Sequence, residues 1–272
     1  MSSDLKNANL LFQGYVNTGL LWNHDSVFGL RQFGPKTNLN SINSEFLSTN
    51  LRLGKLVERF VIHTLQQNEN IEIFKENIQV KKGKVTIGEL DCLLKQNETP
   101  IHLEVIYKFY LYDPHYGKSE LDHWIGPNRN DSLIQKLNKL RDKQLPLLFK
   151  PDALPVLNKL GIDRKKLEQR VHFKAQLFLP LDLSSDQIEI LNKSCLSGNY
   201  IPFADIDHFK NCEFYIPSKL GWLMEIQNDV EWLSFPEFRK DVSRFMVQKR
   251  SPLCWVKYPD GKMQKLFVVW WN

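Results

Sequence analysis

Two carboxylates in the segment 88–108, GELDCLLKQNETPIHLEVIYK, have the residue types and spacing of a metal site. The pattern predicts strands at 88–94 and 101–111, joined by a short turn. Asp91 on the first strand and Glu104 on the second converge if the strands are neighbours in a sheet. Hard carboxylate oxygens suit Mg²⁺ or Mn²⁺, so the pair predicts metal-assisted hydrolysis of a phosphodiester. The alternative is two acids that decorate a solvated face of the sheet.

The second predicted strand alternates between an apolar face and a polar face. The apolar face, which we expect to be core, comprises Ile101, Leu103, Val105, Tyr107, Phe109 and Leu111. The opposite face carries His102, Glu104, Ile106, Lys108 and Tyr110. A carboxylate and an ammonium therefore share one protected face. His102 is either a supporting group of the site or a histidine with a structural role.

Two predicted helices must bring further polar groups to this sheet. The first covers about 50–67 and has an apolar stripe at helical spacing, with Glu58 at the edge of the stripe. Glu58 is a candidate third ligand, and the alternative is a partly solvated surface glutamate. The second helix is expected to begin near Asp131, as its N-cap, and to reach about Leu145, where Pro146 ends it.

Gln144 lies in the middle of the apolar face of this second helix. A buried glutamine needs hydrogen-bond partners, so we expect Gln144 to reach the polar face of the sheet. Lys136, Lys139 and Lys143 are assigned to the opposite side of the helix, which is either solvated or directed at phosphates.

The order helix, three strands, helix, strand over about residues 50–180 resembles the core of the PD-(D/E)xK nuclease superfamily. Glu58, Asp91 and Glu104 occupy the places of the acidic residues in that pattern. The resemblance implies an α/β, restriction-endonuclease-like fold with a mixed sheet. It also implies Mg²⁺ (or Mn²⁺) held by these three residues, and Gln144 as a supporting group.

The lysine of that pattern is displaced in this chain. The superfamily places it two residues after the glutamate, where this sequence has Ile106. Lys108, four residues after Glu104, lies on the same face about 13 Å further along the strand and is the candidate catalytic lysine. Lys95 is a second candidate, and loss of the catalytic lysine is the remaining alternative.

The whole chain also resembles an uncharacterised bacterial family of unknown function, numbered 1853. The motifs that carry this resemblance are LGxxxE at 53–58, GELDxLL at 88–94, HLExxxK at 102–108 with a following aromatic pair, WxGPN at 124–128 and QLPL at 144–147. The resemblance implies the fold but no established activity.

The loop 122–131, DHWIGPNRND, supplies candidate contacts with nucleic acid. Trp124 can stack on a base, and Arg129 can bind a phosphate. Structural roles in ordering the loop remain equally open for both side chains.

The composition permits a nucleic-acid partner without requiring one. The 272 residues include 36 Lys and Arg against 31 Asp and Glu, a formal net charge of +5. This excess of positive charge is smaller than in dedicated DNA-binding domains. Of the two nucleic acids, we expect DNA rather than RNA as the partner. Basic clusters at 81–84, 164–166 and 249–250 are either phosphate contacts or ordinary solvated surface. Motifs of other hydrolases and nucleotide-binding proteins, such as GxSxG, HExxH and the P-loop, are absent.

The cysteines and the hydrophobic pattern indicate a cytoplasmic protein. Four scattered cysteines without a CxxC pair argue against a structural zinc site and fit a reducing compartment. The N-terminal segment lacks the pattern of a signal peptide, and no window has the length of apolar sequence that a membrane span needs. We therefore expect no membrane partner.

The chain is expected to have three parts. Residues 1–49 form an N-terminal helical cap, and residues 50–181 form the nuclease-like core. Residues 182–272 add helices at 184–196 and 234–247 and an aromatic-rich hairpin that packs on the core. The predicted function is a divalent-metal-dependent nuclease. The alternative is a catalytically inactive nuclease-fold protein that binds nucleic acid or acts as a protein-interaction module.

Overall fold

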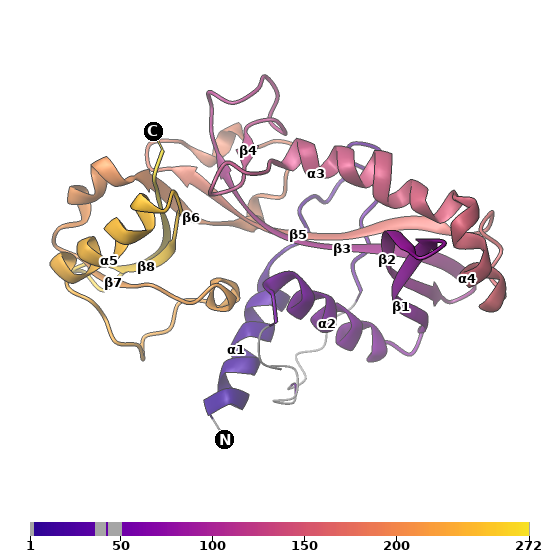
Figure 1. Ribbon diagram of the computed structural model, residues 1–272. Coiled ribbons are helices and arrows are strands. Elements are labelled where there is room, and N and C mark those ends of the chain that lie inside the picture. The colour runs from indigo at the N-terminus through magenta and orange to yellow at the C-terminus, as the bar shows by residue number, and fades with distance from the viewer. Residues whose placement is uncertain (1–2, 36–41, 43–50, 272) are drawn as a thin grey trace.

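A long mixed sheet runs through the computed structural model, which describes residues 3–35, 42 and 51–271 (Figure 1). The strands are β1 (Ile71–Lys82), β2 (Val85–Gln96), β3 (Thr99–Tyr112), β4 (Trp124–Ile125), β5 (Glu168–Pro180), β6 (Leu196–Pro202), β7 (Glu213–Tyr215), β8 (Leu253–Lys257) and β9 (Met263–Val269). Their order is β1-β2-β3-β5-β6-β9-β8-β7, and β4 pairs with β3 outside this path. The inner pairs β3/β5, β5/β6 and β6/β9 are parallel, whereas both ends of the sheet are antiparallel.

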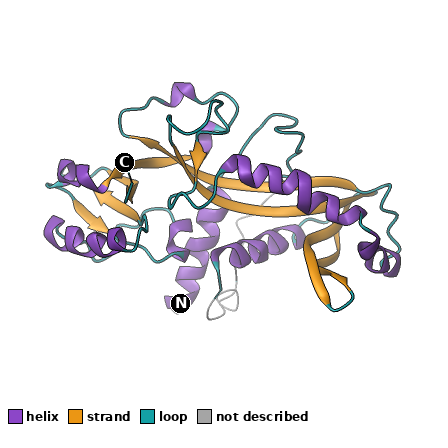
Figure 2. Ribbon diagram, turned by 45° about the horizontal axis from the view of Figure 1, so that its top comes forward, coloured by secondary structure: helices purple, strands orange, loops and turns teal. Residues whose placement is uncertain are grey.

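Helices cover both faces of the central strands (Figures 1 and 2). They are α1 (Ser3–Asn17), α2 (Leu53–Gln66), α3 (Leu133–Lys139), α4 (Leu154–Lys159) and α5 (Phe235–Val247). Short 3-10 segments connect them, namely η3 (Leu145–Phe149), η4 (Pro151–Ala153), η5 (Ser185–Gln187), η6 (Lys193–Cys195), η7 (Phe203–Phe209) and η8 (Leu220–Leu223), and a π-helical turn, η2 (Leu140–Gln144), follows α3. None of the described helices is both long and apolar enough to span a bilayer.

The element order within the central part matches the predicted one. Helix α2 precedes β1, β2 and β3, and α3 precedes β5, with the two-residue β4 inserted before α3 and the short helix α4 inserted before β5. The protein is therefore of the mixed α/β class. Of the predicted N-terminal helical cap, residues 1–2, 36–41 and 43–49 lie outside the described residues.

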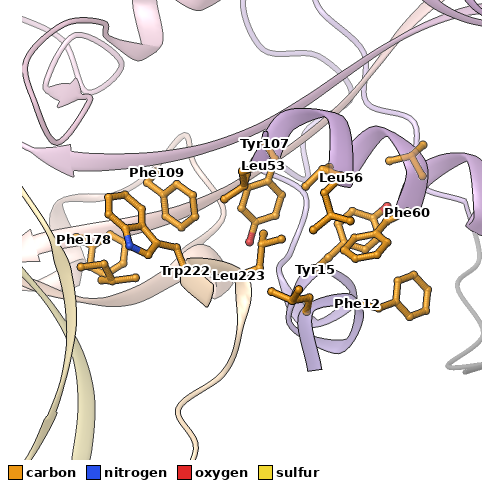
Figure 3. Close-up of a cluster of buried hydrophobic side chains, with 14 of the residues drawn as sticks. Phe12, Tyr15, Leu53, Leu56, Phe60, Tyr107, Phe109, Phe178, Trp222 and Leu223 are labelled. Atoms are coloured by element: carbon orange, nitrogen blue, oxygen red, sulfur yellow. The ribbon is translucent and has the colours of Figure 1, made fainter. Parts of the chain in front are cut away.

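The two faces of β3 alternate as its sequence predicts, and each faces a different core cluster. Tyr107 and Phe109 pack with Phe60 of α2 and with residues of α1 and η8 (Figure 3). Ile106 and Tyr110 pack on the other face in the cluster that contains the leucines of α3. Both faces are buried because helices cover both, so polar side chains on β3 need partners within the protein.

The C-terminal part extends the same sheet. The predicted hairpin is present as β8 and β9, which pair antiparallel and have Gly261 at positive φ in the turn. The helix predicted at 234–247 is α5, with the expected capping box of Ser234 and Glu237.

The prediction of a helix at 184–196 was wrong. This segment holds only the 3-10 turns η5 and η6. The carboxylate of Glu120 accepts the backbone N–H groups of Glu189, Ile190 and Leu191 at 2.9, 2.7 and 3.0 Å. These donors would otherwise serve a helix, so a partner distant in sequence overrides the local helical pattern.

Within the described part of the chain, one edge of β3 has no paired strand over its middle. On the side away from β5, β2 pairs with β3 only up to Leu103, and β4 begins to pair only at Leu111. Among the described strands, none covers residues 104–110 on this side. The predicted site residues of β3 therefore lie beside a gap in the sheet.

Candidate active site

Asp91 and Glu104 lie where β2 and β3 separate. The antiparallel ladder ends at the pair Cys92–Leu103, and the next step in this register would set Asp91 opposite Glu104. Instead, Oδ2 of Asp91 accepts the backbone N–H of Val105 at 2.9 Å. A carboxylate thus replaces the ladder bond, and both acids stay on one side of the sheet because opposite residues of an antiparallel pair share a face.

Glu104 is fully buried and held by two side chains. Nε2 of His102 lies 3.0 Å from Oε1 of Glu104, and Nε2 of Gln144 donates to Oε2 at 2.6 Å. The amide nitrogen of Gln169 donates to the carbonyl of Leu145 at 2.7 Å and faces Nδ1 of His102 at 3.1 Å. Since that nitrogen is a donor, Nδ1 accepts, and neutral His102 carries its proton on Nε2 and donates to Glu104.

Gln144 reaches Glu104 from the π-helical turn η2. Nζ of Lys136 donates to Oε1 of Gln144 at 2.8 Å, which fixes the orientation of the amide. The N–H of Leu145 bonds to the carbonyl of Leu140, five residues back, as in a π-helix. The helix therefore does not continue regularly to Leu145 as predicted, and its N-cap is Ser132, which accepts from the N–H of Gln135, rather than Asp131.

Glu58 approaches the two acids from α2. Its Oε2 accepts from Nζ of Lys55 at 2.7 Å, and the same ammonium contacts Glu89 at 3.2 Å and Asn77 at 3.0 Å. Burial raises the pKa of Glu58, and the charges of Glu89 and Glu104 raise it further against the opposing effect of Lys55. The charge of Glu104 on β3 thus raises the pKa of an acid on each of two other elements, Glu58 on α2 and Asp91 on β2.

The electrostatics of the site favour an added cation. Burial, and then the charges of Glu104 and Glu58, raise the pKa of Asp91 to about 7. Burial, and then the nearby Lys139 and Lys108, lower the pKa of Lys136 to about 8, against the pull of Glu104 and Asp91. Repulsion among buried carboxylates is relieved by a proton or by a metal ion.

The donor set of these acids fits a hard divalent cation. Each carboxylate offers about four lone-pair positions, and the hydrogen bonds to Asp91 and Glu104 leave some of these positions for a metal. Within the described part of the chain, however, no group of three or more His, Cys, Asp or Glu side chains is already arranged to hold a metal ion. Glu58 is paired with Lys55, so joining a metal with Asp91 and Glu104 would require it to exchange partners.

The other predicted site residues lie outside this cluster. Nζ of Lys108 donates to Oδ2 of Asp131 at 2.6 Å. Trp124 is fully buried and packs on Tyr112 with ring centroids 5.1 Å apart, so it cannot stack on a base without leaving the core. Arg129 forms an ion pair with Asp113 at 2.9 Å and lies over the ring of Trp271. Structural roles account for both residues of this loop.

Sequence reasoning missed several members of the site. Lys136 was assigned to the far side of its helix, yet it follows Leu133 by three residues and precedes Leu140 by four. This spacing puts it at the edge of the apolar stripe, a signal that could have identified it. Glu89 is the second residue of the GELD motif, and its membership of that motif is the signal that could have identified it. No local pattern points to Gln169.

Asp91→Asn is expected to stabilise the metal-free protein at pH 8 and to stabilise it less at pH 5. The unfolded chain loses the Asp91 proton near pH 4, and the folded protein keeps it to about pH 7. The folded state therefore binds more protons in this interval, and its stability falls as pH rises from about 4 to about 7. Asn does not ionise and can still accept the N–H of Val105. We expect a rise in Tm on the order of 5 °C at pH 8, measured in EDTA.

The matched control for this prediction is Glu98→Gln, a carboxylate in the exposed turn of the same hairpin. It should shift Tm little at either pH. An equal shift of Tm by Asp91→Asn at pH 5 and pH 8 would contradict the raised pKa.

Comparisons with known proteins give one informative family match. Among curated proteins, the chain is 26% identical over 154 residues to a tRNA(Ile)-lysidine synthase of Caldanaerobacter subterraneus subsp. tengcongensis, a match that covers 51% of this chain and 30% of that protein. The chain thus matches less than a third of that relative's length. No solved structure matches. The family model described as Domain of unknown function (DUF1853) matches residues 33–269, and the chain belongs to this family.

Proposed function

We propose that this protein is a divalent-metal-dependent nuclease with a restriction-endonuclease-like core. The observation that carries the proposal is that Asp91 and Glu104 lie together where β2 and β3 separate, with Glu58 of α2 close enough for its charge to raise the pKa of Asp91. The order of α2, β1–β3, α3 and β5 supports the resemblance to the PD-(D/E)xK core. The substrate is a nucleic acid, with DNA preferred over RNA.

Asp91 and Glu104 would hold Mg²⁺ or Mn²⁺, and Glu58 would complete the set. When bound, the ion neutralises the phosphate and activates the attacking water. His102 and Gln144 hold the carboxylate of Glu104 in a fixed orientation. The proposed metal ligand is therefore positioned before the ion binds.

We assign the lysine role to Lys136 in place of Lys108. The ammonium of Lys136 contacts Gln144, which in turn contacts Glu104, and its pKa responds to both Glu104 and Asp91. The ammonium of Lys108 is bound to Asp131 instead. A lysine beside the carboxylates stabilises the negative charge that develops on the phosphate.

The second candidate function is a nuclease-fold protein that binds nucleic acid without cutting it. The observations that favour it are the hydrogen bonds on both oxygens of Glu104 and the ion pair between Lys55 and Glu58. If these contacts persist, the acids do not reach a common ion.

A cleavage assay separates the two functions. Linear, nicked, branched and single-stranded DNA would be incubated with Mn²⁺, with EDTA as the control. A tRNA belongs in the panel because the curated relative is, by name, a tRNA(Ile)-lysidine synthase. Cleavage that EDTA stops and added Mn²⁺ restores would support the nuclease. The binding-only protein would cut no substrate, and its Tm would be the same with and without Mn²⁺.

A further inference from the structure

The unpaired stretch of β3 has the carboxylates at its beginning and a group of cations near its end. Lys108 is four residues beyond Glu104 on the same face, about 13 Å along the strand. One strand of a nucleic acid carries a phosphate about every 3.4 Å along the helix axis of a duplex. A phosphate at Lys108 is therefore a different phosphate from the one at the acids.

Lys219 joins Lys108 from the C-terminal part of the chain. The residue is exposed, but its Nζ lies 3.1 Å from the ring centroid of Trp222 and 5.3 Å from that of Phe109. Burial of this ammonium against the rings lowers the pKa of Lys219, and the charges of Lys108 and Arg250 lower it further. Lys219 is thus close enough to both Lys108 and Arg250 to be repelled by each of them.

Arg250 is held beside them by its neighbour in the chain. The N–H of Ser251 donates to Oδ1 of Asn128 at 2.8 Å, and its hydroxyl donates to the carbonyl of Pro127 at 2.7 Å. These bonds dock residues 250–251 on the loop that precedes α3. Arg250 itself is exposed, so its guanidinium is accessible.

The cations of this group exceed the carboxylates that balance them. Among the described residues, Asp131 is the acid that forms an ion pair with Lys108 and acts on Lys219. Three cations beside one carboxylate leave an uncompensated positive charge, which is unfavourable unless an anion arrives. Residues 249–250 form a basic cluster in the sequence, and the fold brings Arg250 close to Lys219, on which Lys108 also acts.

We propose that Lys108, Lys219 and Arg250 form a separate contact site for the phosphate backbone of a nucleic acid strand that runs between this site and the carboxylates. The proposal rests on the proposed function for its substrate class. Contacts of this kind position the strand and do not read its bases, so the site contributes affinity without sequence preference. It places the scissile phosphate at the carboxylates by holding a neighbouring phosphate.

The test is the binding of fluorescein-labelled duplex and single-stranded DNA in EDTA, followed by anisotropy over a series of salt concentrations. The double variant Lys219→Gln with Arg250→Gln is compared with Lys193→Gln with Lys240→Gln, which removes the same charge from exposed positions. We expect the first variant to weaken binding about tenfold or more and to reduce the salt slope by about 2, one for each phosphate that the variant no longer neutralises. The control should change neither by as much, and both variants should melt like the parent.

Several results would overturn the site. These are affinity and salt slope equal to those of the parent, an equal loss of affinity in the control variant, or no binding by the parent at low salt. The outcome is independent of cleavage because EDTA removes the metal. If the double variant binds like the parent while Asp91→Asn abolishes cleavage, this site is wrong and the nuclease stands. If binding falls as expected but no substrate is cut with Mn²⁺, the site stands and the nuclease is wrong.

Discussion

Asp91→Asn is expected to lower the rate of Mn²⁺-dependent cleavage by about 10³-fold or more. A bound cation supplies several kcal/mol of stabilisation in phosphodiester hydrolysis, and each 1.4 kcal/mol corresponds to about tenfold in rate. Asn has nearly the shape of Asp and can keep the hydrogen bond from the N–H of Val105. Loss of the negative charge is therefore the main change, and the protein should remain folded.

Stability separates this loss from unfolding. Because burial and neighbouring acids raise the pKa of Asp91, the variant should melt at or above the parent's temperature at pH 8. An inactive variant that is more stable is the signature of a charge kept for function. Glu98→Gln, in the exposed turn between β2 and β3, removes a carboxylate from the same hairpin and should leave the rate unchanged. More than a tenth of the parent's rate in Asp91→Asn would remove Asp91 from the ligand set.

Glu104→Gln should be equally inactive but less stable. Its amide would present an N–H₂ group either to Nε2–H of His102 or to the amide nitrogen of Gln144, and both of these are donors. A buried donor that faces another donor costs about 1–3 kcal/mol. The pair of variants thus distinguishes an acid whose charge is destabilised by burial and by neighbouring acids from one whose carboxylate is held by a side-chain network.

Local pattern was sufficient for the central strands β1, β2, β3 and β5, for the hairpin of β8 and β9, and for one long-range contact. The alternation of β3 predicted which residues face each layer, and the placement of Gln144 on the apolar face of its helix predicted that it would reach the sheet. The first prediction rests on the two-residue period of a strand, which the folded chain keeps. The second holds because the turn at 140–144, although irregular, leaves Gln144 on the side that faces the sheet.

Features that depend on partners distant in sequence could not be predicted in this way. Glu120 binds the N–H groups of 189–191 and prevents a helix there, and no local signal in that segment reports it. The π-helical turn at 140–144 breaks the 3.6-residue period that the helix prediction assumed. Trp124 looked like a nucleic-acid contact because aromatic residues in loops suit that role, but β4 pairs with β3 and places the ring in the core.

The second large effect is expected at Lys136. Lys136→Met should lower kcat by roughly 10²–10³-fold, the usual cost of removing one group that stabilises transition-state charge. Lys108→Met should instead raise KM with a smaller effect on kcat, since we place Lys108 at a neighbouring phosphate. The opposite pattern, with the larger kcat loss at Lys108, would return the catalytic role to the strand.

A pH profile tests whether Lys136 acts through its charge or only by holding Gln144. The pKa of Lys136 is lowered to about 8, so its ammonium is present below that pH and is lost above it. Cleavage should therefore fall on the alkaline side as pH rises through about 8. Lys136→Arg keeps a positive charge at every pH in this range and can still donate to Gln144, so its residual activity should lack the alkaline fall. A purely structural role for Lys136 would leave the shape of the profile the same in the parent and in the arginine variant, because the hydrogen bond to Gln144 alone does not require a titrating charge.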